Sequence, residues 1–332
     1  MGGSALKIET RRVESSREFY DLVREVTNIL TQQLEWHVAS IRWYRQKESF
    51  GDMDILVNSN SIGENWVETV LETFQPNDHF KNGPCLSFDY KGVQVDLILA
   101  QSNSFDFSYN YFSWNDLGNF IGRTAYRLGF KFGHDGLWYV LRDPEDNTHV
   151  IKEILISRDF DRVVKFLGYR AAPFHVGFDT PEQIYEFVTT SMHFDPRQFF
   201  LVNRSYAARV RDKKRKMYTG MLEYIRLKYP DIGEESVPLP IDRNEHLIRA
   251  FAWFPDFKAQ YDDAIAEFKL NQEFKKKFNG LVIGSLFGLE GKALGECMSA
   301  LRWKIDKYDL RQFVIDLNER QAKEFFIILD ED

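Results

Sequence analysis

Hydrophobic residues in the first third of the chain change from a helical to a strand spacing. Residues 15–36 place apolar side chains three and four positions apart, which predicts an amphipathic helix. The run DMDILVN over 52–58 predicts a mostly buried strand, and a helix is expected at 63–74. Two further strand-like runs, CLSFDY and VQVDLILA, flank Lys91-Gly92, a pair that can form a hairpin turn.

The middle of the chain continues this mixed pattern. A helix is expected at about 115–129, and KFGHDGLWYVLRD predicts a second hairpin with its turn at Asp135-Gly136. Helix, strands, helix and further strands are typical of an α+β domain. We therefore expect a mixed sheet with flanking helices in a first domain, residues 1–170.

After about residue 170 the pattern is mainly helical. The segment YPDIGEESVPLP at 229–240 is rich in loop-forming residues and separates the expected helices. These helices are expected over 180–191, 196–228, 242–254, 256–278, 292–304 and 308–323. A chain of 332 residues holds about two domains of ordinary size, so we expect a second, mainly α-helical domain over 171–332.

Composition narrows the class of protein. An apolar content of 44% is ample for a packed core, and a net charge of −7 excludes a basic surface over the whole protein. Cys85 and Cys297 are the only cysteines, which excludes a disulfide framework and a cysteine-rich zinc fold. No apolar run reaches the length of a membrane helix, and the N-terminus has no apolar signal core. We expect a cytoplasmic protein with reduced thiols and no membrane partner; the sequence does not predict its oligomeric state.

Three aspartates interrupt the apolar strands. Asp52 and Asp54 lie two positions apart, so their carboxylates share one face of the strand, and Gly51 allows a close backbone approach to a ligand. Asp96 interrupts VQVDLIL, where a buried carboxylate needs a partner or a metal. Three carboxylates at one sheet edge predict a site suited to Mg²⁺. The alternative is an acidic strand end, with Asp96 paired to an arginine.

The residues around these aspartates resemble a known family. SFGDMDILV followed by GVQVDLIL is similar to the palm of the family X DNA polymerases, within the DNA polymerase beta nucleotidyltransferase superfamily. TAYRLGFKF and SRDFDRVVKFLGY resemble the thumb subdomain of that family, and the resemblance covers roughly residues 30–170. A further stretch follows the family pattern without a gap, at the family's spacing from Asp96. Its residues are Tyr111, Phe112, Ser113, Asp116, Asn119 and Arg123.

The resemblance implies a two-metal nucleotidyltransferase. Asp52 and Asp54 would bind both Mg²⁺ ions, for which Mn²⁺ can substitute, and Asp96 would bind the catalytic ion and help to activate a hydroxyl. The implied reaction is in-line attack by a nucleic-acid 3′-hydroxyl on the α-phosphate of a nucleoside triphosphate, releasing pyrophosphate. DNA repair is the pathway that such an enzyme typically serves.

The resemblance also implies a nucleotide pocket. Tyr111 and Phe112 would line the sugar site and disfavour a 2′-hydroxyl, so that dNTPs are the expected substrates. Asp116 and Asn119 would lie against the incoming base, one helical turn apart. Arg123 would contact a template strand, which suggests templated synthesis. The alternative for Arg123 is an ion pair on a helix surface.

The phosphate-binding residues of the family are less well matched. Ala39-Ser40 stands where the family has Gly-Ser, at a longer distance from the aspartates. Ser40 and the backbone amide of Gly51 are candidate phosphate donors. Arg45 falls at the position of a phosphate-binding arginine of the family, and Arg42 is the second candidate. Either arginine could instead be a solvated surface charge.

The chain departs from the family in three further ways. Trp114 replaces a glycine of a tight turn, which leaves the backbone geometry there, and base selection with it, open. Only about 15 residues precede the first expected helix, so we expect no 5′-deoxyribose-phosphate lyase activity. Residues 204–228 are rich in Lys and Arg with tyrosines between them and could track nucleic-acid phosphates, with a weaker basic cluster at 275–277. The alternative for the basic segment is a solvated helix face.

Other functions stay open. FNGLVIGSLFGLEGKALGECMSALRWKI faintly resembles the C-terminal helices of bacterial CCA-adding enzymes, which extend tRNA ends without a template, although ordinary helix packing would give the same pattern. A nucleotidyltransferase acting on a small molecule or a protein is a second alternative. An inactive nucleotide-binding module is a third, and the presence of all three aspartates argues against it.

Overall fold

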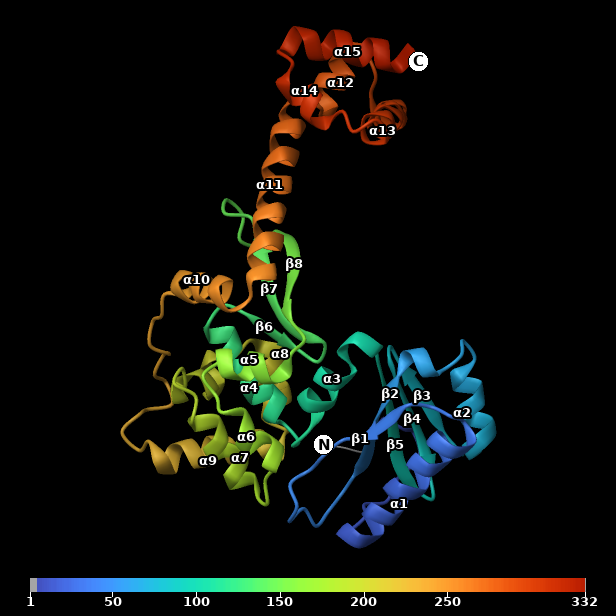
Figure 1. Ribbon diagram of the computed structural model, residues 1–332, viewed down its shortest axis with the longest axis vertical. Helices are drawn as coiled ribbons and strands as arrows, with labels where there is room; N and C mark the ends of the chain where they lie inside the picture. The colour runs from blue at the N-terminus through green and yellow to red at the C-terminus, as the bar shows by residue number, and fades with distance from the viewer. Residues whose placement is uncertain (1–4, 332) are drawn as a thin grey trace. The chain divides into compact units, whose positions relative to one another are not determined.

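The structure is a computed structural model that describes residues 5–331 (Figure 1). Its contacts divide the chain into two compact units. One holds the residues up to Val140 together with Glu153–Pro255, and the other holds Leu141–Lys152 together with the residues from Asp256 onward. The expected boundary between residues 170 and 171 falls inside the first unit. The two compact units therefore do not coincide with the two expected domains.

The first unit contains a five-stranded mixed sheet in the order β1-β2-β5-β4-β3. Its central strands, β2 and β5, are parallel, and the other neighbouring pairs are antiparallel. The strands are β1 (Val38–Ser40), β2 (Asp52–Asn58), β3 (His79–Asn82), β4 (Cys85–Tyr90) and β5 (Val93–Ala100). The three strands expected here are confirmed. The turn between β4 and β5 is Lys91-Gly92, with φ of 52° and 78°.

Helices α1 (Ser16–Asn28) and α2 (Trp66–Phe74) cover one face of this sheet (Figure 1). Alternation along β2 sends Met53, Ile55 and Val57 into the core beneath them. Asp52 and Asp54 therefore project from the other face. The helices expected at 15–36 and 63–74 are confirmed with slightly different bounds, and α1 continues into a π-helical turn at Ile29–Gln33.

Helix α3 (Phe105–Phe112) packs on the other face of the sheet, at the end away from the aspartates. Ile41, Leu56, Ala100 and Phe105 form a small core there. Short 3-10 turns at Ser59–Ser61 and Ser102–Ser104 follow β2 and β5. The sequence pattern did not predict α3. Phe105, Tyr109 and Phe112 have helical spacing, but the aromatic residues at 105, 107, 109 and 111 also alternate as in a strand.

A three-stranded sheet follows α4 (Leu117–Arg127), in the order β6-β7-β8. Its strands are β6 (Lys131–Gly133), β7 (Gly136–Arg142) and β8 (Val150–Ser157). The expected hairpin is present, but the turn at Asp135-Gly136 is wrong by one residue, because Gly133 pairs with Gly136. Gly136 has φ 145°, and a Cβ there would lie 2.9 Å from the Ser157 carbonyl oxygen. Close packing against β8, rather than the turn, requires this glycine.

The rest of the first unit is helical. A single helix over 196–228 is wrong, because a buried ion pair between Arg204 and Asp212 and a cap by Ser205 break this region into short elements. The elements are α5 (Phe160–Phe166), α6 (Ala171–Val176), α7 (Pro181–Thr189), the 3-10 turns η4 (Pro196–Phe199) and η5 (Leu201–Asn203), α8 (Tyr206–Asp212), α9 (Lys216–Lys228) and α10 (Arg243–Trp253).

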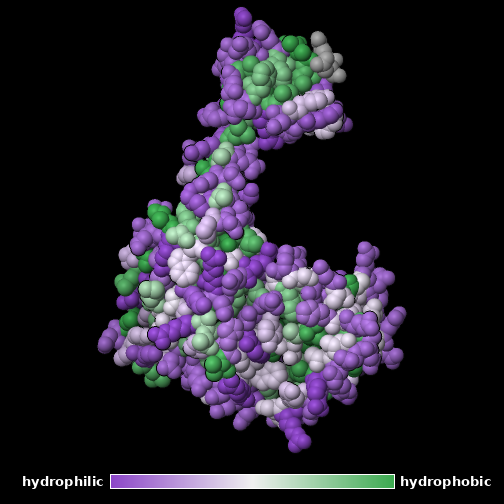
Figure 2. Space-filling model, viewed as in Figure 1, coloured by the Kyte–Doolittle hydropathy of each residue, from purple (hydrophilic) through white to green (hydrophobic). Residues whose placement is uncertain are grey.

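The second unit is mainly helical, with a core around Phe278, Leu301 and Phe326. On the face of this unit that is visible in Figure 2, hydrophobic side chains gather together. Its helices are α11 (Pro255–Lys277), α12 (Gly280–Phe287), α13 (Gly291–Lys307), α14 (Arg311–Asp316) and α15 (Glu319–Glu331). A single helix at 308–323 is wrong, because Asn318 caps a new helix by accepting a hydrogen bond from the Gln321 amide. The expected α+β class with a helical C-terminal region is confirmed. No helix within residues 5–331 is long and apolar enough to cross a membrane.

Candidate metal centre

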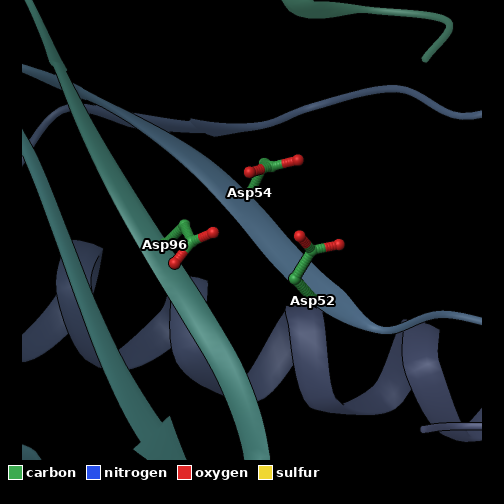
Figure 3. Close-up of side chains that lie close together, drawn as sticks. All are labelled: Asp52, Asp54 and Asp96. Atoms are coloured by element: carbon green, nitrogen blue, oxygen red, sulfur yellow. The ribbon is translucent and has the colours of Figure 1, made fainter. Parts of the chain in front are cut away.

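Asp52, Asp54 and Asp96 converge on one face of the five-stranded sheet (Figure 3). Parallel pairing places Asp54 directly opposite Asp96 and Asp52 opposite Gln94. One carboxylate oxygen from each aspartate lies within 4.8 Å of the others. The spacing of two along β2 and the register with β5 therefore bring together carboxylates that are more than forty residues apart in the sequence.

The three carboxylates repel one another in the absence of a cation. Loss of hydration between the strands, with the negative charges of Asp52 and Asp96, raises the pKa of Asp54 well above its usual range. The Asp54 residue is exposed at the protein surface, where the two neighbouring negative charges oppose its ionisation. Burial and the charge of Asp52 also raise the pKa of Asp96, against hydrogen bonds from Ser87 and Gln94. Such a cluster is poised to bind a cation.

Two residues that sequence reasoning missed support this cluster. The buried Gln94 donates from Nε2 to both carboxylate oxygens of Asp96, at 3.0 Å each, and its own Oε1 accepts from the Ala5 amide. Lys47 interacts electrostatically with Asp52 and Asp54, although burial lowers the pKa of its ammonium. Gln94 lies two positions before Asp96, so strand alternation could have identified it. The loop that holds Lys47 carries no comparable signal.

The residues present fit a divalent cation. All three are carboxylates, which are hard oxygen ligands of the kind that Mg²⁺ and Mn²⁺ take. Their oxygens are close enough to share a metal, and one of them is already oriented by an amide.

The candidate phosphate-binding residues do not all lie beside the aspartates. Register pairs Ser40 with Ile55, which puts Ser40 on the sheet face opposite to the aspartates. Gly51 is buried directly before β2. The guanidinium of Arg45 pairs with Asp179 at 2.6 Å and donates to the Val176 carbonyl. Ser40 thus lies on the face away from the aspartates, and Arg45 is paired with other residues in this structure.

Arg42 connects the end of β1 to the segment after α3. Its guanidinium donates to Ser113 Oγ at 3.1 Å and to Asn110 Oδ1 at 2.7 Å, and it lies 5.0 Å from the centroid of the Trp114 ring. The Trp114 amide in turn donates to the Arg42 carbonyl at 2.7 Å. Arg42 therefore positions this segment rather than standing in solvent.

Trp114 keeps a glycine-like backbone at the position where the family has glycine. Its φ is 66°, and that of Asn115 is 59°, both in the left-handed region. The buried ring of Trp114 packs edge-on against Phe178. A Cβ on Gly177 would lie 2.5 Å from that ring. Ring packing therefore compensates a backbone conformation that tryptophan rarely adopts.

The expected sugar-pocket residues lie together at the end of α3. Tyr111 packs edge-on against Phe112, and the Phe112 ring stacks on His134 at 5.8 Å. A Cβ on Gly118 would meet the Tyr111 carbonyl oxygen at 2.2 Å, so only glycine allows α4 to approach α3 this closely. Sequence reasoning missed Gly118, since the contact is not visible in a local pattern.

The expected base-contacting residues lie at the start of α4. Asp116 forms an ion pair with Arg215, which comes from the basic segment. Two buried nitrogen atoms, Nδ2 of Asn119 and Nε of Arg123, have no hydrogen-bond partner among the described residues. Arg123 donates instead from Nη2 to the Gln198 carbonyl at 2.9 Å. The structure thus leaves buried donors unpaired along this helix.

Comparison with known proteins does not assign the chain to a family. No protein-family model matches the sequence, and no curated protein is significantly similar to it.

Proposed function

We propose that the protein is a metal-dependent nucleotidyltransferase that adds nucleotides, preferentially from dNTPs, to a nucleic-acid 3′-hydroxyl. The convergence of Asp52, Asp54 and Asp96 within 4.8 Å of one another carries this proposal. A lone acidic strand end would not gather carboxylates from two strands, and the alternative of an arginine partner for Asp96 is not what the structure contains, since Gln94 binds it. The resemblance of the surrounding sequence to the family X DNA polymerases is consistent with the same chemistry.

The positions of the residues are consistent with the roles that we assign to them. Asp52 and Asp54 offer oxygens from one face of β2, and Gln94 fixes the Asp96 carboxylate opposite them. Divalent ions bound here would offset the charge of the substrate phosphates and align the attacking and leaving oxygens. Asp96 would also accept the proton of the attacking hydroxyl at a carboxylate oxygen. Lys47 is a candidate for the triphosphate, because its charge interacts with those of Asp52 and Asp54.

The preference for dNTPs is expected at Tyr111 and Phe112. If the Tyr111 ring approaches the 2′ position, Tyr111→Ala will relax the selection of the sugar, measured as the ratio of kcat/KM for dATP and ATP. Phe80→Ala is a suitable control, because Phe80 is an exposed aromatic residue on the edge strand β3. Equal use of the two nucleotides by the unmodified protein would favour the alternative of an RNA-extending enzyme.

The grip on nucleic acid is expected at Lys213, Lys214 and Lys216, which are exposed between α8 and the start of α9. Arg215 is excluded from this test because its ion pair holds Asp116. Changing the three lysines to glutamate should weaken primer binding and flatten its dependence on salt, because fewer counterions are released. Binding of a nucleotide with its metal at the aspartates should survive. Unchanged affinity and salt slope would reduce this segment to a solvated surface.

A panel of acceptors tests the proposal as a whole. DNA and RNA primers, with and without template, are incubated with each dNTP and NTP and Mg²⁺, and extension is measured on a gel. Asp52→Asn and Asp54→Asn should abolish extension, whereas Glu64→Gln, which neutralises an exposed acid outside the site, should not. Extension that survives both aspartate changes contradicts the proposed centre.

A further inference from the structure

A second site lies in the first unit, in a pocket of about 320 Å³ between α4, the 3-10 turns η4 and η5, and the segment before α10. Three arginines line it: Arg123, Arg127 and Arg243. Within the described part of the chain, none of its lining residues is acidic and none belongs to the aspartate cluster. The pocket is therefore positively charged and separate from the candidate metal centre.

The fold holds these arginines in place. Arg123 donates to the Gln198 carbonyl at 2.9 Å, and Arg127 donates to the His193 carbonyl at 3.0 Å. Arg243 donates to the carbonyls of Tyr126 and Arg127, at 3.3 Å each. Because carbonyl acceptors carry no net charge, these bonds fix the guanidinium groups without neutralising them. A ligand would meet cations that have already lost most of their rotamer freedom.

One carboxylate touches this group of arginines. Asp195 lies 3.5 Å from Arg127 and 3.1 Å from Arg197, so one negative charge is shared between two cations. The group keeps an excess of positive charge that a bound anion can balance.

Three residues that line the pocket also carry buried polar atoms that have no hydrogen-bond partner among residues 5–331. Gln198 is 2% exposed, and neither oxygen nor nitrogen of its side-chain amide is paired. The Nε atoms of Arg123 and Arg127 are likewise buried and unpaired. Buried polar groups without a partner are rare in folded proteins. Arg123, Arg127 and Gln198 all line this pocket, so a ligand that supplies oxyanion acceptors and a hydroxyl could satisfy them after small side-chain movements.

We propose that this pocket binds a small phosphomonoester. Guanidinium groups match phosphate oxygens in charge and in geometry. The Gln198 amide can bind a hydroxyl of the organic part, and Pro238, Leu239 and Pro240 form an apolar wall beside it. The volume suits a small metabolite rather than a large cofactor. A phosphate of a nucleic-acid strand offers the same oxygens, and the test separates it from the small molecule.

Calorimetric titration with ribose 5-phosphate, ribose, inorganic phosphate and a single-stranded oligonucleotide, all with EDTA, tests the proposal. We expect ribose 5-phosphate to bind, ribose not to bind, and Arg243→Ala to weaken binding about tenfold or more. The oligonucleotide should bind no better than inorganic phosphate. Arg24→Ala, which removes a cation from an exposed ion pair on α1, and Asp96→Asn should both leave the affinity unchanged. The latter separates this inference from the proposed function.

A second variant, Gln198→Leu, tests the proposal even if Arg243→Ala disturbs the end of α4. Replacing an unpaired buried amide by an apolar side chain should raise the melting temperature of the ligand-free protein and weaken binding of ribose 5-phosphate. Equal binding of ribose and ribose 5-phosphate, unchanged affinity in both variants, or binding of the oligonucleotide alone would overturn the proposal.

Discussion

The buried ion pair between Arg204 and Asp212 gives the sharpest stability prediction. The side chains are 5% and 0% exposed, and the Asp212 carboxylate accepts from Arg204 Nε at 3.0 Å, from Arg204 Nη2 at 2.8 Å and from Arg211 Nε at 2.9 Å. Asp212→Ala leaves the Arg204 guanidinium buried with no opposing charge. Removing one partner of such a pair destabilises a protein by about 3–5 kcal/mol.

Urea unfolding at neutral pH, followed by circular dichroism, measures this effect. With a slope near 3 kcal/mol per molar urea, the midpoint should fall by about 1–2 M. Asp21→Ala is the matched control. It breaks an ion pair with Arg24 whose side chains are 55% and 64% exposed, and it should change the stability by less than about 0.5 kcal/mol.

A double variant separates the charge from the packing. Arg204→Met with Asp212→Leu removes both charges together, and it should recover most of the lost stability, because apolar replacements of buried pairs are often neutral or stabilising. A loss in Asp212→Ala no larger than in Asp21→Ala would refute the assignment of this pair as the reason that the basic segment breaks between α8 and α9.

Three further outcomes are expected. Trp114→Gly relieves a left-handed backbone worth about 1 kcal/mol but removes a buried ring worth about 3–5, so a net loss near 2–4 kcal/mol should appear in urea unfolding, whereas a gain would contradict the packing argument. Burial, together with Arg249, His246 and Arg127, lowers the pKa of His193 to about 4. The folded protein therefore resists protonation of His193, and its stability should fall as the pH drops from about 6.5 to 4. A pH series of melting temperatures checks this, and the fall should be less steep in His193→Gln. Asp54→Asn removes one of three like charges, so it should raise the melting temperature of the metal-free protein and abolish the rise caused by MnCl₂; a rise that persists would place the metal elsewhere.

Local sequence patterns were sufficient to predict the strands that carry the three aspartates. The apolar runs DMDILVN and VQVDLILA predicted both strands, and the structure brings their three aspartates together. The resemblance to the family X DNA polymerases predicted roles for the residues from Tyr111 to Arg123, which stay predictions, and it could not show how that segment is held. The Arg42 contacts and the Asp116–Arg215 ion pair join residues about 70 and 99 positions apart, and no local pattern reports them.

The errors in the helical half have a common physical cause. Residues 196–228 and 308–323 have helical spacing, but Arg204–Asp212 in the first range and the Asn318 cap in the second replace helical continuity with other hydrogen bonds. Helix α12 escaped prediction because Gly280 and Gly284 lower its helix propensity. Asn279 starts this helix by accepting hydrogen bonds from two backbone amides at 3.0 Å each.

Metal-dependent incorporation of a labelled nucleotide by the Asp96→Asn variant tests the central claim most directly. The change is close to isosteric and leaves Gln94 in place, so the fold should persist, as circular dichroism and the melting curve will verify. The unmodified protein should extend a primer with dNTP and Mg²⁺, and not in EDTA, while Asp96→Asn should lose at least about a thousandfold in kcat, because an electrostatic contact made in the transition state is lost. Extension by the folded Asp96→Asn variant at the rate of the unmodified protein, or extension by the unmodified protein in EDTA, would contradict the account.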